Sequence, residues 1–158
     1  MLGDGSSSRL FLNVREEAGL AYDVHSFQTD YADCGSLQVY AGVDPADVQP
    51  ALAAILAELD RLRQAPVAPE ELARARAYVS GRLELRLEDS RHLAAWLGVQ
   101  EALHDRVLTV DEALERLAAV SAQDVQALAG RLIRDEALCL ALITPADAAG
   151  LERTLRLT

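Results

Sequence analysis

The stretch from Ser6 to Tyr22 constrains the fold most, because it combines the pattern of a helix, a stop signal and the start of a strand. It reads S-S-S-R-L-F-L-N-V-R-E-E-A-G-L-A-Y. The apolar residues at helical spacing predict one buried stripe: Leu10, Phe11, Val14 and Ala18. The serines at 6–8 offer hydroxyls that could cap the first helical N–H groups. The helix is expected to end at Gly19, since glycine enters the left-handed conformation there without strain.

After Gly19 the sequence alternates like a β-strand over residues 20–27, with Tyr22 and Val24 on one face. Arg15 then lies in the last helical turn, and Tyr22 lies just inside the strand. Seven positions separate these two residues across a tight corner, so their side chains can point into the same space. On the residues alone, Arg15 equally fits a cation that complements the helix dipole, and Tyr22 a half-buried strand aromatic.

The rest of the sequence predicts a hairpin, several helices and a last strand. The hairpin is expected over residues 20–43, with its turn at D-Y-A-D-C-G. Helix starts are indicated by capping residues and by proline in the first turn: Asp44, Pro69, Thr109 and Ser121. The apolar run Ala137–Thr144 has the length of a strand. The order of these elements predicts a single α+β domain over residues 1–158, with helices packed on one face of a mainly antiparallel sheet.

Composition excludes some classes of partner. Hydrophobic residues make up 51% of the chain and charged residues 25%, as in a globular protein. The net charge of −10 argues against nucleic acid, because phosphate binding needs clustered cations. The same charge could steer basic peptides toward the chain, or could simply keep it in solution. No apolar run is long enough to cross a membrane, and no signal-peptide pattern opens the sequence, which leaves the compartment undecided between cytoplasm and periplasm.

Candidate metal ligands are few and poorly spaced. The histidines are His25, His92 and His104, and no two of them have the spacing of ligands on one helix. Cys34 lies in the predicted turn, and Cys139, inside the apolar run, is expected in the core. Neither cysteine has the C-x-x-C spacing of a zinc or redox site, so we expect no metal or cofactor to bind to this chain.

The run L-G-D-G-S-S-S-R-L-F-L-N-V-R-E-E-A-G-L-A-Y resembles a family signature. It is similar to the pattern L-G-G-G-x-S-S-R-L-F-x-x-V-R-E-x-x-G-L-A-Y in the second domain of the inverzincin zinc metallopeptidases. That family includes pitrilysin, insulysin, the mitochondrial processing peptidases and small bacterial members. The resemblance extends to about Pro145, and the chain departs from the signature at Asp4, where the family has glycine.

The resemblance implies a role in the hydrolysis of peptide bonds. The family's zinc motif, H-x-x-E-H, is absent from this sequence, so the zinc would belong to a partner domain or subunit, and this chain alone would be inactive. Arg15 and Tyr22 match the family's arginine and tyrosine, which hold the backbone of a peptide or unfolded protein substrate, and the tyrosine also helps to stabilise the oxyanion. The alternative implied by the same family is a catalytically inactive scaffold or peptide-binding subunit.

The resemblance also implies that the chain is the C-terminal portion of a second domain. Family members carry further strands before the L-G-G-G segment, and these early strands are missing from this sequence. A sheet without them exposes an edge with unpaired N–H and C=O groups, so we expect the chain to self-associate through that edge.

Overall fold

The computed structural model describes residues 1–103, 106–145 and 150–157. The chain forms two compact units. The first unit comprises Met1–Val67 together with Val125–Thr158, and the second comprises Ala68–Asp124. His104 and residues 146–149, where the sequence suggests the start of a short helix, lie outside the described residues.

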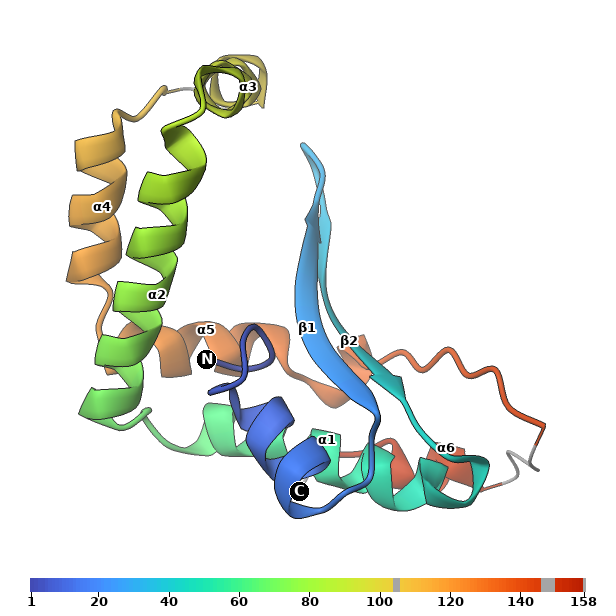
Figure 1. Cartoon of the computed structure of the whole chain (residues 1–158). Helices are drawn as coiled ribbons and strands as arrows, with labels where there is room; N and C mark the ends of the chain where they lie inside the picture. The colour runs from blue at the N-terminus through green and yellow to red at the C-terminus, as the bar shows by residue number, and fades with distance from the viewer. Residues whose placement is uncertain (104–105, 146–149, 158) are drawn as a thin grey trace. The chain divides into compact units, whose positions relative to one another are not determined.

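The first unit contains the hairpin and the helices next to it in sequence (Figure 1). Its elements are η1 (Leu10–Glu17), β1 (Asp23–Asp30), β2 (Gly35–Gly42), η2 (Pro45–Asp47), α1 (Val48–Gln64), most of α5 (Ala122–Leu132), η3 (Asp135–Ala137) and α6 (Leu151–Thr154). The hairpin is antiparallel, with Val24 opposite Ala41 and His25 opposite Tyr40. The combination of this sheet with helices confirms the predicted α+β class.

The core of the first unit lies on one face of the hairpin. Leu10 and Val14 from η1 are fully buried and pack with Ala21 and Val24 at the start of the hairpin. Partly buried residues complete the cluster: Leu2, Leu20, Val39, Ala41, Val43, Ala54 and Ile55. The opposite face, with His25 and Tyr40, is exposed, so the packed core of the first unit lies on only one face of the hairpin.

The helix predicted after the serines is present, but it is a π-helix and the serines do not cap it. The N–H group of Ala18 donates to the carbonyl of Asn13, five residues earlier, at 3.2 Å. At the other end, the N–H groups of Arg9 and Leu10 donate to the carbonyls of residues 1 and 2, both at 2.9 Å. The serine caps predicted at 6–8 are therefore wrong, because the first two residues of the chain supply the acceptors.

Two glycines shape this end of the chain. Gly19 has φ +65°, as predicted for the end of the helix. Gly3 lies against β1, where the N–H of Ser26 donates to the Gly3 carbonyl at 3.0 Å, and a Cβ at Gly3 would approach the Ser26 nitrogen to 2.4 Å. Asp4 is exposed, and no residue other than glycine has a positive φ in the described chain, so aspartate fits without strain where the family has glycine.

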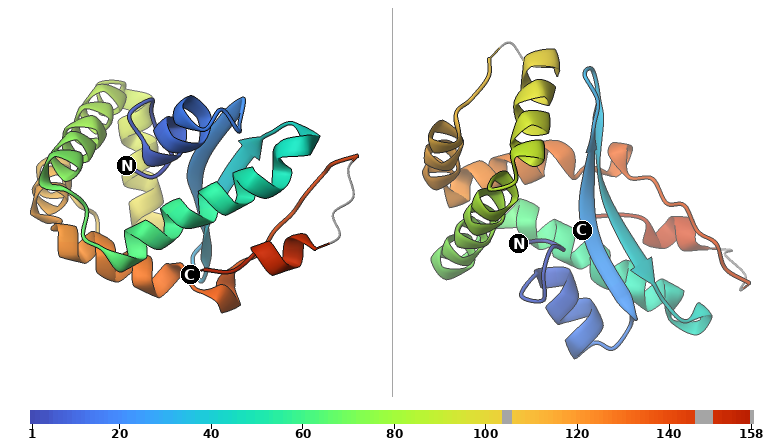
Figure 2. Two further views of the ribbon diagram at one scale, coloured as in Figure 1. Left: turned by 90° about the horizontal axis from the view of Figure 1, so that it is seen from below. Right: turned by 45° about the horizontal axis from the view of Figure 1, so that its top comes forward.

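The strand predicted over Ala137–Thr144 is wrong. The only sheet in the described ranges is the hairpin, and residues 138–144 form an extended arm with no strand beside it (Figure 2). An extended segment becomes part of a sheet only when a neighbour completes the hydrogen-bond ladder. Cys139 is consequently exposed rather than in the core, and Ile143 is fully exposed.

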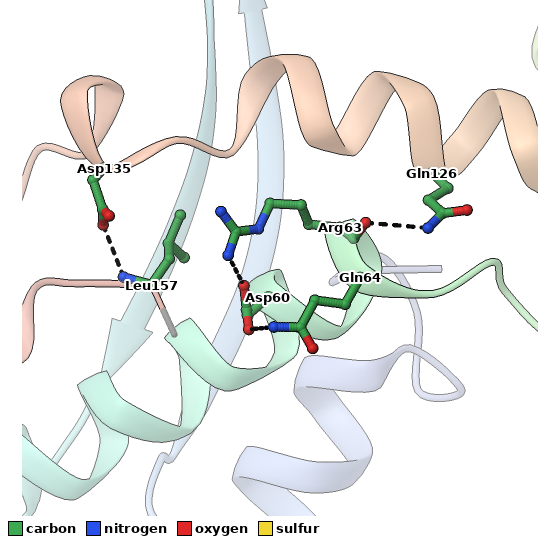
Figure 3. A network of polar contacts seen from close by, with 6 residues as sticks. All are labelled: Asp60, Arg63, Gln64, Gln126, Asp135 and Leu157. Carbon is green, nitrogen blue, oxygen red and sulfur yellow. Dashed lines mark hydrogen bonds and ion pairs between the residues drawn. The ribbon is translucent and has the colours of Figure 1, made fainter.

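A group of polar contacts at the C-terminal end of α1 includes one hydrogen bond from α5, and a separate bond joins Leu157 to Asp135 (Figure 3). The buried carboxylate of Asp60 accepts hydrogen bonds from Arg63 and Gln64. The side chain of Gln126 donates to the backbone carbonyl of Arg63 at 3.3 Å. The bond from Gln126 joins α5 to the C-terminal end of α1. None of the helices in the described part of the chain is long and apolar enough to cross a membrane.

The second unit is helical, with α2 (Pro69–Leu87), α3 (Ser90–Leu103) and α4 (Val110–Ala119). Pro69 occupies the first turn of α2, as predicted. The capping box predicted at Thr109 is present: its hydroxyl accepts from the N–H of Glu112 at 3.2 Å, and the Glu112 carboxylate accepts from the Thr109 N–H at 2.9 Å. The backbone N–H of Thr109 holds the pKa of Glu112 below its ordinary value.

We expect Glu112→Gln to lower the free energy of unfolding at neutral pH, because the amide lacks the charge that strengthens the hydrogen bond from the Thr109 N–H. The lowered pKa of Glu112 contributes stability above the ordinary carboxyl pKa, and this contribution is lost as the pH falls through the folded-state value. The difference between the two proteins should therefore narrow in acid. Chemical denaturation at pH 7 and pH 3 measures it, with Ser90→Ala on the exposed start of α3 as control. A difference that widens in acid would contradict this account.

Candidate functional site

The corner between η1 and β1 carries both residues that the sequence singles out. Backbone hydrogen bonds close it: the N–H of Leu20 donates to the Val14 carbonyl at 2.9 Å, and the N–H of Tyr22 donates to the Gly42 carbonyl at 2.8 Å. Gly19 supplies the left-handed turn within the loop that the first of these bonds closes. The corner is thus held by main-chain contacts on both sides of the glycine.

Arg15 lies in the last turn of η1, as predicted. Its Cζ atom lies 4.7 Å from the centroid of the Phe11 ring, and its Nε atom lies 3.7 Å from Oε1 of Glu16. The Arg15 side chain is 41% exposed. The guanidinium therefore lies over an aromatic face, and the side chain as a whole is exposed to solvent.

Tyr22 immediately precedes β1 rather than lying inside it, which corrects the predicted position. The predicted alternation also fails here, because Ala21 and Val24 are buried while Tyr22 is 75% exposed. The reason is the corner itself: Ala21 fills the core position next to η1, and regular pairing begins only at Asp23. The phenol is thus available to a ligand, and the interpretation of Tyr22 as a half-buried strand aromatic is wrong.

A buried carboxylate that the sequence analysis did not identify fixes η1 to α1. Oε1 of Glu58 accepts a hydrogen bond from Nδ2 of Asn13 at 2.8 Å and another from Nη1 of Arg61. Glu58 is only 2% exposed. The signal in the sequence is its position, because Ile55, Glu58 and Leu62 share one helical stripe and a carboxylate there needs a partner.

The exposed face of the hairpin carries a small aromatic group. The ring of His25 lies 5.8 Å from that of Phe27 and 5.1 Å from that of Tyr40, measured between centroids. Nδ1 of His25 lies 3.3 Å from a carboxylate oxygen of Asp23. Within the described ranges, no three His, Cys, Asp or Glu side chains converge as a metal site would require.

We expect Asn13→Ala to lower the free energy of unfolding by about 1–3 kcal/mol, because it removes a hydrogen bond from a buried carboxylate. Gln123→Ala, which truncates an exposed amide on α5, is the matched control and should cost less than about 0.5 kcal/mol. Urea denaturation of both variants measures the effect. Equal stabilities for the two variants would mean that the contact between Asn13 and Glu58 does not hold η1 in place.

Curated proteins that are similar to this chain are described as zinc proteases. An uncharacterized zinc protease of Streptomyces coelicolor is 41% identical over 128 residues, which are 81% of this chain and 28% of that protein. The uncharacterized zinc protease YmxG of Bacillus subtilis is 35% identical over 145 residues, 92% of this chain and 35% of that protein. This chain therefore spans only about a third of the length of these curated relatives.

Among solved structures, the inactive peptidase domain of a candidate zinc protease from Bordetella parapertussis superposes with a TM-score of 0.76 at 25% identity. The match covers 94% of this chain and 80% of that one. Residues 1–79, which hold the η1 corner and the hairpin, match the family described as the peptidase M16 inactive domain. The chain belongs to the peptidase M16 inactive domain family.

Proposed function

We propose that this chain is the C-terminal domain of a zinc metallopeptidase that does not itself bind zinc and that completes the site of a partner domain. In this proposal the partner, with its H-x-x-E-H motif, supplies the metal and the attacking water, and Arg15 and Tyr22 grip the peptide. The observation that carries the proposal is the corner at Gly19. The corner lies within the matched family region, it joins the helix that carries Arg15 to the strand that follows Tyr22, and both side chains are exposed to solvent.

The chemistry of the two side chains suits this role. A guanidinium presents planar, paired N–H donors to the carbonyl oxygens of a peptide backbone. A phenol supplies one directed donor, which is most useful where negative charge develops on the attacked carbonyl oxygen. Neither group can activate water in place of a metal, so the proposal requires a zinc-bearing domain or subunit of the same family. The bound substrate would be a peptide or an unfolded protein segment.

The second candidate is a catalytically inactive scaffold or peptide-binding subunit of the same fold. It is favoured by the description of the matched family as an inactive domain and by the absence of H-x-x-E-H from this sequence. In that case the same corner would bind a peptide without contributing to its cleavage. A zinc-bearing domain or subunit that binds this chain and cleaves peptides would discriminate between the two.

We expect Arg15→Ala and Tyr22→Phe each to lower kcat/KM of the full assembly by at least about tenfold, because each removes a donor to the substrate. The controls are Arg74→Ala, an exposed arginine on α2, and Tyr31→Phe, a tyrosine that is 67% exposed in the hairpin turn. Cleavage of an internally quenched peptide measures the rates. If both site variants cleave as fast as their controls, Arg15 and Tyr22 do not have the proposed roles.

We further propose that strands preceding this sequence complete the domain. Residues 138–143 are extended and belong to no sheet of the described chain, and the Bordetella parapertussis domain has a fifth of its length beyond the match. The chain by itself should then self-associate through its exposed sheet edge, together with the extended residues 138–143, in which Leu140 is 42% exposed.

Light scattering across a hundredfold range of concentration tests this expectation. The apparent mass should rise with concentration, and Ile143→Lys should reduce the rise, since a charge on an extended segment opposes edge pairing. Leu85→Lys, which places the same charge on the exposed side of α2, is the control. A constant monomer mass would contradict the expectation.

A further inference from the structure

The environment of Arg15 contains a feature that the proposed function does not use. The guanidinium lies over the face of Phe11, with 4.7 Å between Cζ and the ring centroid. This distance is within the range in which an aromatic ring attracts a cation. Phe11 is half-buried, so the ring is anchored by η1 rather than free in solvent.

The geometry of η1 fixes where this pair points. Residues four apart are neighbours along a helix, and Leu10 and Val14 form such a row, fully buried in the core. Phe11 and Arg15 each follow a member of that row by one residue, so they form a second row beside it on the surface of η1. Because the buried row and the hydrogen bond from Asn13 to Glu58 set the rotation of η1, they also set the direction of the neighbouring row.

We propose that Phe11 is a positioning residue, which orients Arg15 so that it meets a ligand through its terminal N–H groups. This inference rests on the proposed function of Arg15. The guanidinium lies over the Phe11 ring on one side, and a carboxylate oxygen of Glu16 lies 3.7 Å from its Nε atom. The two terminal nitrogens remain, and they donate in the plane of the group. The acceptor that fits is a main-chain carbonyl oxygen of an extended peptide.

The test compares Phe11→Leu with Phe11→Tyr in the full assembly. Leucine keeps an apolar side chain but removes the aromatic face, whereas tyrosine keeps the face. We expect Phe11→Leu to lower kcat/KM by about two- to fivefold, which corresponds to the loss of an exposed cation–π contact. Phe11→Tyr should leave kcat/KM close to that of the unmodified protein. Phe27→Leu, an exposed aromatic on the hairpin, is the matched control. A purely structural role would instead appear as equal losses for leucine and tyrosine, and would overturn the proposal.

A double variant separates this inference from the proposed function. If Phe11 acts through Arg15, Phe11→Leu should have no further effect on kcat/KM once Arg15→Ala is present. If Arg15→Ala slows cleavage but Phe11→Leu does not, the positioning role is overturned and the role of Arg15 stands. If Arg15→Ala has no effect on cleavage, the proposed function fails and the positioning role fails with it.

The chain itself provides a readout that is independent of cleavage. A proton held over an aromatic face is shifted upfield, so the Nε–H resonance of Arg15 should move downfield in Phe11→Leu and stay in place in Phe11→Tyr and Phe27→Leu. Two-dimensional NMR of arginine side chains measures this. An Arg15 resonance that is unchanged in Phe11→Leu would overturn the proposed orientation.

Discussion

The contact between η1 and the elements it packs on is the interaction on which the rest of the first unit depends. Leu10 and Val14 are buried against the start of the hairpin, and Asn13 donates to the buried carboxylate of Glu58 on α1. An apolar contact can slide, but a hydrogen bond to a carboxylate that is 2% exposed allows little movement, because breaking it leaves a buried charge underpaired. Because η1 is held in this way, the corner that carries Arg15 and Tyr22 is also held in place.

The start of the sequence supports the same corner. Residues 1 and 2 supply carbonyl acceptors to the first turn of η1, and Gly3 lies so close to Ser26 that no larger residue would fit without movement. Gly3 therefore allows the chain to pack closely against β1, and residues 1 and 2 cap the N-terminal end of the π-helix. The L-G-D-G segment therefore helps to hold the corner that carries Arg15 and Tyr22 in place.

Features that depend on a few neighbouring residues could be predicted from the sequence, whereas contacts between distant residues could not. The left-handed turn at Gly19, the proline start of α2 and the capping box at Thr109 each depend on a few neighbouring residues, and each is present. The contact between Asn13 and Glu58 joins residues 45 apart and has no local signature. The strand predicted at 137–144 failed for the same reason, since a strand forms only where a neighbour pairs with it.

The candidate site was predicted in part. The resemblance identified Arg15 and Tyr22, but a period-2 alternation put Tyr22 inside the strand, whereas the buried Ala21 breaks that alternation and leaves the phenol exposed. Phe11 fits the predicted buried stripe by its spacing, yet it is half-buried and lies under Arg15. A pattern of apolar residues cannot distinguish a core aromatic from one that orients a cation.

The central claim is that this chain completes a zinc site held elsewhere. Its most direct test is to isolate the native protein gently from its own cells and to measure intact masses and zinc content of everything recovered. The account predicts an H-x-x-E-H sequence, either in a chain longer than 158 residues or in a co-purifying subunit, with about one zinc ion per such motif. A native protein of this length, recovered with neither zinc nor an H-x-x-E-H partner, would contradict it.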